Sequence, residues 1–119
     1  MKVAVYGASQ KINRYSNKVI RLLKRKGYEV YPINPTITKI EGLDVFPNLA
    51  AISQPIHTLT IYLNPARQKA VFDDIVNGDL KRVIFNPGTE NKELTEALEK
   101  KGIEVLNVCT LVMLQVDGL

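Results

Sequence analysis

The sequence contains one cysteine, one histidine and no tryptophan among 119 residues. A single cysteine, Cys109, excludes an intrachain disulfide framework and is typical of a reducing compartment, so we expect a cytoplasmic protein. One histidine and one cysteine do not fill the four positions of a usual zinc site, and we predict no metal centre. No apolar run approaches the roughly 20 residues of a membrane span, and no secretory signal pattern is present, so we expect no membrane partner.

Acidic residues are absent from the first 28 positions, which hold eight of the 16 Lys and Arg residues. This stretch carries +8, and the rest of the chain, with eight basic and 12 acidic residues, carries −4. Basic patches on RNA-binding folds are usually accompanied by exposed strand aromatics or Gly-Arg tracts, and neither is evident here. We therefore expect a small polyanion and no nucleic acid as the partner of this charge.

Short apolar runs alternate with amphipathic helical segments along the chain. The expected strands are Lys2–Tyr6, Tyr28–Ile33 with Pro32 inside it, Thr58–Leu63, Arg82–Phe85 and Ile103–Val108. The expected helices are Asn17–Lys26 after an N-cap at Ser16, Pro65–Asn77 after an N-cap at Asn64, and a segment around Leu94 and Leu98 after an N-cap at Thr89 or Asn91. Positions 36–55 follow no clear period and hold a turn at Gly42.

Strands separated by helices of about ten residues imply parallel pairing with right-handed crossovers and helices on both faces of the sheet. The sequence therefore predicts an α/β fold, a Rossmann-like three-layer αβα sandwich with a five-stranded, mainly parallel sheet. Its length and apolar content fit one domain over residues 1–119.

Ligands of open parallel sheets bind beyond the carboxyl ends of the strands, where the strand order reverses. The segments that follow the expected strands are all small, polar or turn-forming. They are Gly7-Ala8-Ser9, Asn34-Pro35, Asn64-Pro65, Asn86-Pro87-Gly88 and Cys109-Thr110.

The segment after the first strand has the residues of a phosphate site. Gly7 permits close backbone approach, and Ser9 can donate its N–H and its hydroxyl to a phosphate oxygen. Lys11, Arg14 and Lys18 can add charge-assisted hydrogen bonds. Lys18 stands near a helix start, where the dipole disfavours a cation unless an anion binds beside it. The alternative is structural, since glycine at a strand-helix junction is often only a turn residue.

A site for NAD would show the pattern G-x-G-x-x-G and an acidic residue at the end of the second strand. Here only the first glycine, Gly7, is present, and the second strand ends in Asn34. NAD, NADP or another nucleotide is therefore the less favoured ligand. A ligand with more phosphate and no need for a carboxylate on its ribose fits better.

Two segments together resemble a known family. They are Gly7-Ala8-Ser9 followed by Arg14-Tyr15-Ser16, and Gly27-Tyr28-Glu29-Val30-Tyr31-Pro32-Ile33-Asn34-Pro35 about twenty residues later. The order and spacing are similar to the small stand-alone coenzyme A-binding proteins of bacteria and to the CoA-binding domain of the succinyl-CoA synthetase α subunit. The sequence differs from that family at His57, where an Asp is usual, and at Asn86-Pro87-Gly88, where Gln-x-Gly is usual.

The resemblance implies that the chain binds coenzyme A or an acyl-CoA. It implies that Gly7, Ala8, Ser9, Arg14 and Ser16 hold the phosphates. The Asn34-Pro35 corner, with Lys39 and Ile40, would flank the adenine side.

No catalytic constellation is evident, so we favour a binding module over an enzyme. His57 precedes a strand, at the end of the sheet opposite the expected ligand, and is assigned a structural role. Cys109 follows a strand and could face a ligand thiol, but a buried apolar role is favoured. Two alternatives stay open, a subunit of a CoA-ligase-like enzyme and a homo-oligomer assembled through the apolar segment Leu111–Leu114.

Overall fold

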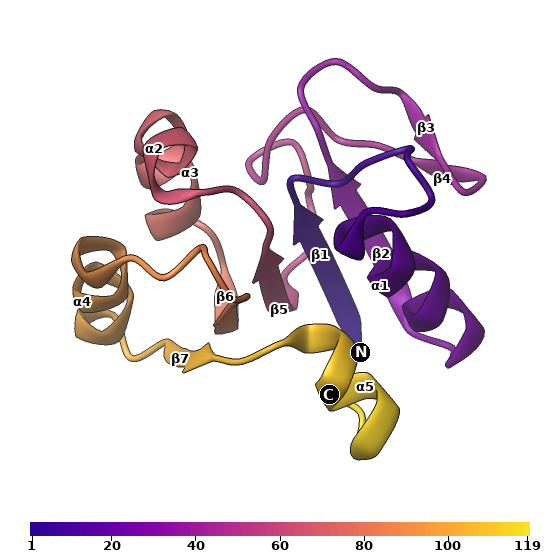
Figure 1. The fold of residues 1–119 in the computed structure, drawn as a ribbon. Helices are drawn as coiled ribbons and strands as arrows, with labels where there is room; N and C mark the ends of the chain where they lie inside the picture. Colours follow the sequence, from indigo (N-terminus) through magenta and orange to yellow (C-terminus); the bar gives the residue numbers. More distant parts are fainter.

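The computed structural model describes all residues 1–119 and contains one five-stranded sheet with helices on both faces (Figure 1). Its order is β2-β1-β5-β6-β7, and all four strand pairs are parallel. The bounds are β1 Lys2–Tyr6, β2 Glu29–Ile33, β5 Ile56–Ile61, β6 Leu80–Phe85 and β7 Glu104–Asn107. The predicted Rossmann-like α/β fold is confirmed.

Side chains of β1 alternate between two separate cores, one on each face of the sheet. Val3 and Val5 pack with buried residues of α1 (Tyr15–Arg25) and α5 (Thr110–Val116). Ala4 and Tyr6 pack with Ile75 and residues of α4 (Lys92–Lys100) on the other face. Burial on both faces explains why the strand is an uninterrupted apolar run, as is usual in parallel sheets.

The strand order reverses between β1 and β5. From β1 the chain crosses first to β2 on one side, and then returns past β1 to β5 on the other. The crossovers on the two sides leave a crevice at the carboxyl ends of β1 and β5, which is where ligands of doubly wound sheets bind. Strand β2 lies at the sheet edge, where the missing N–H of Pro32 costs no interior ladder bond.

Helix boundaries differ from the sequence-based prediction at two places. Helix α1 begins at Tyr15 with Arg14 at the N-cap and without a side-chain cap, so Ser16 lies in the first turn and is not the N-cap. The single helix expected over 65–77 is broken into α2 (Pro65–Gln68), a 3-10 turn η1 (Lys69–Val71) and α3 (Phe72–Val76). The break falls at Val71, whose φ of −117° leaves the helical region.

Two other helices begin as their sequences predict. The Asn64 side chain accepts a hydrogen bond from the N–H of Arg67 at 2.9 Å, and Pro65 takes the first helical position. The Asn91 side chain accepts from the N–H of Leu94 at 3.0 Å, which selects Asn91 over Thr89 as the cap of α4.

Two elements were not predicted. The irregular stretch after β2 contains a short hairpin, β3 (Lys39–Ile40) with β4 (Leu43–Asp44). The last apolar segment forms α5, which packs beside α1 through the fully buried Leu114 (Figure 1). No helix in the structure has both the length and the apolar character needed to cross a lipid bilayer.

His57, at the amino end of β5, lies opposite the crevice, and its position gives a pH prediction. Burial lowers the pKa of His57 below its usual 6.5, and the charges of Arg82 and Lys81 lower it further. The unfolded chain therefore takes up a proton at a pH where folded His57 stays neutral. The free energy of unfolding should fall as the pH drops below about 6.5, and His57→Gln should reduce this slope. Urea titrations across the range measure it, and equal slopes for the two proteins would refute the assignment.

Candidate functional site

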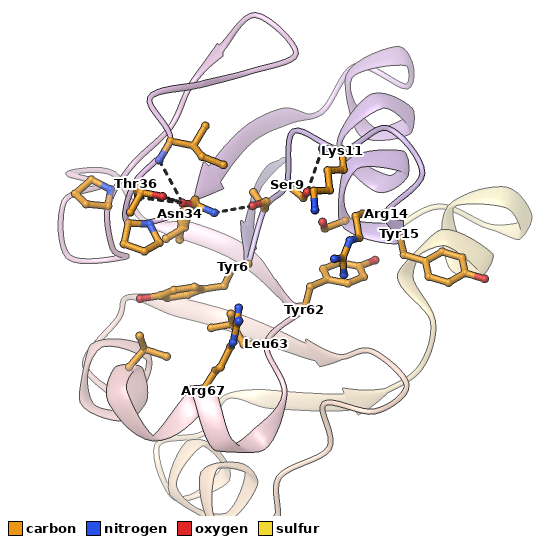
Figure 2. A pocket seen from close by; sticks show the side chains of 18 of the residues that line it. Tyr6, Ser9, Lys11, Arg14, Tyr15, Asn34, Thr36, Tyr62, Leu63 and Arg67 are labelled. Carbon is orange, nitrogen blue, oxygen red and sulfur yellow. Dashed lines mark hydrogen bonds between the residues drawn. The ribbon is translucent and has the colours of Figure 1, made fainter.

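A cavity of about 660 Å³ opens at the carboxyl ends of β1, β2 and β5 (Figure 2). Its volume lies within the range of sites for small molecules. Eight of the residues selected from the sequence line it: Gly7, Ala8, Ser9, Lys11, Arg14, Ser16, Asn34 and Pro35. The cavity therefore lies where the strand order reverses, at the carboxyl ends of the strands, where the sequence predicted the ligand.

Gly7 is required by the packing of β1 against β5. It has a φ of +90°, and a Cβ at this position would lie 3.1 Å from the Leu63 side chain and from the Tyr62 backbone. The amides of Gly7 and Ala8 both donate to the carbonyl of Ile33 at 3.1 Å. These two N–H groups therefore join the first two strand ends and are not free to bind a ligand.

Ser9 keeps donors available. Its hydroxyl oxygen accepts from the N–H of Lys11 at 3.1 Å, which leaves the hydroxyl hydrogen free to donate. The N–H of Ser9 makes no hydrogen bond within the chain. Both donors that the sequence assigned to Ser9 are thus present beside the cavity.

The loop between β1 and α1 is held in place by two residues of α1 that sequence reasoning missed. Asn17 is fully buried and donates from Nδ2 to the carbonyl of Ser9 at 2.9 Å. Arg21 donates to Asn17 Oδ1 at 2.8 Å and to the carbonyl of Ile12 at 2.7 Å. The sequence did contain a signal for this role, because Asn17 is a polar residue on the apolar face of an amphipathic helix. This network fixes the loop before any ligand arrives, which lowers the entropy cost of binding.

The start of α1 faces the cavity with unpaired backbone donors. The N–H groups of Tyr15, Ser16 and Asn17 make no hydrogen bond within the chain, and the first turn contains no acidic residue. Ser16 is 4% exposed and lines the cavity. Free N–H groups at the positive end of an 11-residue helix attract an anion.

Three cations and no carboxylate stand among the 19 residues that line the cavity. Lys11 and Arg14 come from the loop before α1, and Arg67 comes from α2. Only two of the eight basic residues in the first 28 positions reach the cavity. Others are used elsewhere: Lys2 pairs with Glu29 at 3.7 Å, and the Lys18 amine lies 5.2 Å from the centre of the Tyr15 ring.

Three residues selected from the sequence do not line the cavity. Lys39 forms an ion pair with Asp44 across the β3-β4 hairpin. Ile40 is 2% exposed and belongs to the core beneath α1. Asn64 uses its side-chain oxygen to cap α2.

Asn34 lines the cavity but uses its side chain within the protein (Figure 2). Its Nδ2 donates to the carbonyl of Ala8 at 3.0 Å. Its Oδ1 accepts from the N–H groups of Thr36 at 3.0 Å and Ile37 at 3.2 Å. Asn34 thus fixes the loop after β2 against the loop after β1.

The remaining wall is largely apolar and was not selected from the sequence. It is formed by Tyr6, Ile33, Pro47, Tyr62, Leu63, Ala70 and Val71. The Tyr6 hydroxyl donates to Asp74 at 2.7 Å, and burial together with this bond raises the pKa of Tyr6 above its usual range. Burial also raises the pKa of the Tyr62 hydroxyl, so both tyrosines are neutral at physiological pH. Four of these residues, Tyr6, Ile33, Tyr62 and Leu63, lie at strand ends or directly after them, whereas Ala70 and Val71 come from η1 and Pro47 from a loop.

The two residues considered for chemistry lie outside the cavity. His57 is at the opposite end of β5, and Cys109 precedes α5 without lining the cavity. No group of three His, Cys, Asp or Glu side chains is placed to hold a metal ion.

Comparison with known proteins relates the whole chain to one domain type. A family model described as a CoA binding domain matches residues 1–115. The uncharacterized protein YneT of Bacillus subtilis (strain 168) is 28% identical over 105 residues, which cover 88% of this chain and 78% of YneT.

Solved structures share the fold. A crystal structure of an uncharacterized protein is 37% identical with a TM-score of 0.90 and covers 99% of this chain and 97% of its own. The dinucleotide-forming acetyl-coenzyme A synthetase 1 of Ca. Korarchaeum cryptofilum, in complex with phosphate and ADP, is 26% identical with a TM-score of 0.77. That match covers 90% of this chain and 25% of the synthetase.

Proposed function

The chain belongs to the CoA binding domain family, and from this we propose that it binds coenzyme A or an acyl-CoA in the cavity, without catalysis of its own. The observation that carries the proposal is the charge of the cavity: three cations and no carboxylate among its lining residues. An excess of cations around the cavity without counter-charge favours a ligand with several phosphate charges. Coenzyme A carries a diphosphate and a 3′-phosphate.

The phosphates would bind at the junction between β1 and α1. There the free N–H and hydroxyl of Ser9, the unpaired amides of the first turn of α1, and the Ser16 side chain supply hydrogen-bond donors. Lys11 and Arg14 supply the charge. Because Asn17 and Arg21 already fix this loop, the donors are arranged before the ligand binds.

The uncharged parts of the ligand would lie along the apolar wall. The adenine would bind beside Asn34 and Pro35, where the chain turns after β2. Leu63, Ala70 and Val71 give a surface for the pantetheine arm, which has little charge.

NAD is a poorer ligand for this cavity. A carboxylate that would hold the ribose hydroxyls is absent from the lining, and the side-chain oxygen of Asn34 is occupied by the amides of Thr36 and Ile37. NADP carries a phosphate on this ribose and does not need the carboxylate. Its affinity is therefore the more informative comparison with that of coenzyme A.

Binding is tested by native mass spectrometry of the purified protein and by titration calorimetry with coenzyme A, NAD and NADP. We expect coenzyme A to bind with a dissociation constant of about 1 µM or lower, and at least about tenfold more tightly than either dinucleotide. Absence of heat and of a thermal shift with millimolar coenzyme A would refute the proposal.

A second candidate function is that the chain is the CoA-binding part of a CoA-ligase-like assembly. Its similarity to about a quarter of an acetyl-coenzyme A synthetase favours this reading, since the remaining three quarters would then be supplied by another chain. The two functions are separated by co-purification from the native source followed by an assay for acyl-CoA synthesis. A stable partner with ligase activity selects the second.

A further inference from the structure

Arg67 reaches the cavity from a different wall than Lys11 and Arg14. It belongs to α2, which follows β5, whereas the other two cations precede α1. Figure 2 shows the Arg67 side chain extending from α2 toward the cavity between Tyr6 and Tyr62, with Lys11 and Arg14 on the facing loop. The positive charge of the cavity is therefore divided between two walls.

The backbone that carries Arg67 is fixed on both sides. The N–H of Arg67 donates to Asn64 Oδ1 at 2.9 Å. The next residue, Gln68, is fully buried and donates to the carbonyls of Leu63 at 2.8 Å and Thr89 at 2.7 Å. Its side-chain oxygen accepts from Asn91 at 2.9 Å. Arg67 thus extends from a rigid support, as residues that select a ligand usually do.

The guanidinium of Arg67 has no partner within the chain. It makes neither a hydrogen bond nor an ion pair, and the cavity holds no acid. The carboxylate of Asp74, behind the cavity-lining Tyr6, is already occupied by three donors, the hydroxyl of Tyr6 at 2.7 Å and the amides of Leu49 at 2.8 Å and Ala50 at 3.0 Å. An arginine beside the apolar Leu63 and Val71, without a protein counter-charge, is suited to an anionic group of a ligand.

We propose that Arg67 forms a second anion subsite, separate from the diphosphate site at Ser9 and Arg14. This inference rests on the proposed function, because it concerns a second anionic group of the same ligand. Coenzyme A chemistry offers two such groups, the 3′-phosphate and the free carboxylate of a dicarboxylic acyl chain. Both present oxygens that a guanidinium binds in a bidentate manner. The cavity then selects ligands in which two anionic groups stand apart.

The test compares Arg67→Gln with wild type against four ligands by calorimetry. Coenzyme A and dephospho-coenzyme A differ only in the 3′-phosphate, and succinyl-CoA and acetyl-CoA differ in a terminal carboxylate. Arg25→Gln is the matched control, because Arg25 is exposed in the last turn of α1 and does not line the cavity. Thermal unfolding of both variants checks that the fold is kept.

We expect Arg67→Gln to weaken the binding of one member of a ligand pair at least about tenfold and the binding of the other member less than about twofold. Arg25→Gln should bind all four ligands with an affinity near that of wild type. A selective loss for coenzyme A identifies the 3′-phosphate, and a selective loss for succinyl-CoA identifies the carboxylate. Equal losses for all four ligands place Arg67 on the shared diphosphate and overturn the inference, as does no loss for any. Wild-type protein that binds none of the ligands overturns the proposed function itself.

Discussion

Replacing Arg14 by glutamate should weaken the binding of coenzyme A at least about 100-fold. Arg14 lines the cavity at the N-cap of α1, next to free backbone donors, and makes no side-chain cap bond of its own. A hydrogen bond between charged groups contributes about 1.5 to 3 kcal/mol, and the new carboxylate would also repel the diphosphate. Calorimetry with coenzyme A measures the change.

The control is Arg25→Glu, which changes the net charge equally at the far end of the same helix. Because exposed charges farther apart than about 10 Å are largely screened at 0.1 M salt, this variant should bind within about threefold of wild type. Equal weakening by the two variants would mean that only the overall charge matters. Wild-type affinity in Arg14→Glu would remove Arg14 from the site.

Features encoded locally in the sequence were predicted well. The run Lys2–Tyr6 ending at Gly7 predicted β1 and its loop, because a strand buried on both faces is apolar throughout. Asn64-Pro65 predicted the start of α2 through cap chemistry. The rule that ligands bind at strand ends then selected Gly7-Ala8-Ser9 and Asn34-Pro35, which line the cavity. It also selected Asn64-Pro65, Asn86-Pro87-Gly88 and Cys109-Thr110, which do not.

Features that depend on contacts distant in sequence were missed. Arg67 lies in a helix far along the chain from Arg14. The two residues line one cavity only because β1 and β5 are neighbours in the sheet. The eight basic residues near the N-terminus led us to overestimate the charge of the site, because only two of them line the cavity. A helix directs its side chains around its axis and along its length, so the others point elsewhere. Ile40 was predicted to flank the adenine, but its side chain lies in the core beneath α1.

Helix α5 was missed for a related reason. Its apolar run is short, and its start is defined by a partner on another element instead of a local cap. Thr110, the first residue of α5, donates its N–H to Asn86 Oδ1 at 2.8 Å, and Cys109 at the N-cap contributes no side-chain bond. Such a cap, supplied by a residue 24 positions away, cannot be recognised from the neighbouring sequence.

The substitution Asn86→Ala, which removes the partner of Thr110, should lower the free energy of unfolding by about 3 kcal/mol and the melting temperature by about 10 °C. Asn86 is 2% exposed, and its Nδ2 donates to Thr60 Oγ1 at 2.7 Å and to the carbonyl of Ile61 at 2.9 Å. With the bond to Thr110, three buried hydrogen bonds are lost, and their partners stay out of reach of water.

Asn107→Ala is the control for this variant. Asn107 is an exposed asparagine at the end of β7 whose side chain makes no hydrogen bond, so its loss should change the free energy of unfolding by less than about 0.5 kcal/mol. Asn86→Asp keeps the acceptor for Thr110 but places a buried carboxylate oxygen against the carbonyl of Ile61, so it should destabilise the fold at least as much as Asn86→Ala. Urea unfolding measures all three, and an Asn86→Ala value within about 1 kcal/mol of wild type would refute the role of the network.

The same substitution should separate stability from ligand binding. Asn86, Thr60 and Thr110 are buried beneath the start of α5 and do not line the cavity. Loosening α5 should therefore expose Cys109 at the N-cap and speed its labelling by a thiol reagent, while the affinity for coenzyme A stays within about threefold of wild type. Slow labelling combined with a large loss of affinity would mean that the network supports the cavity and not the helix.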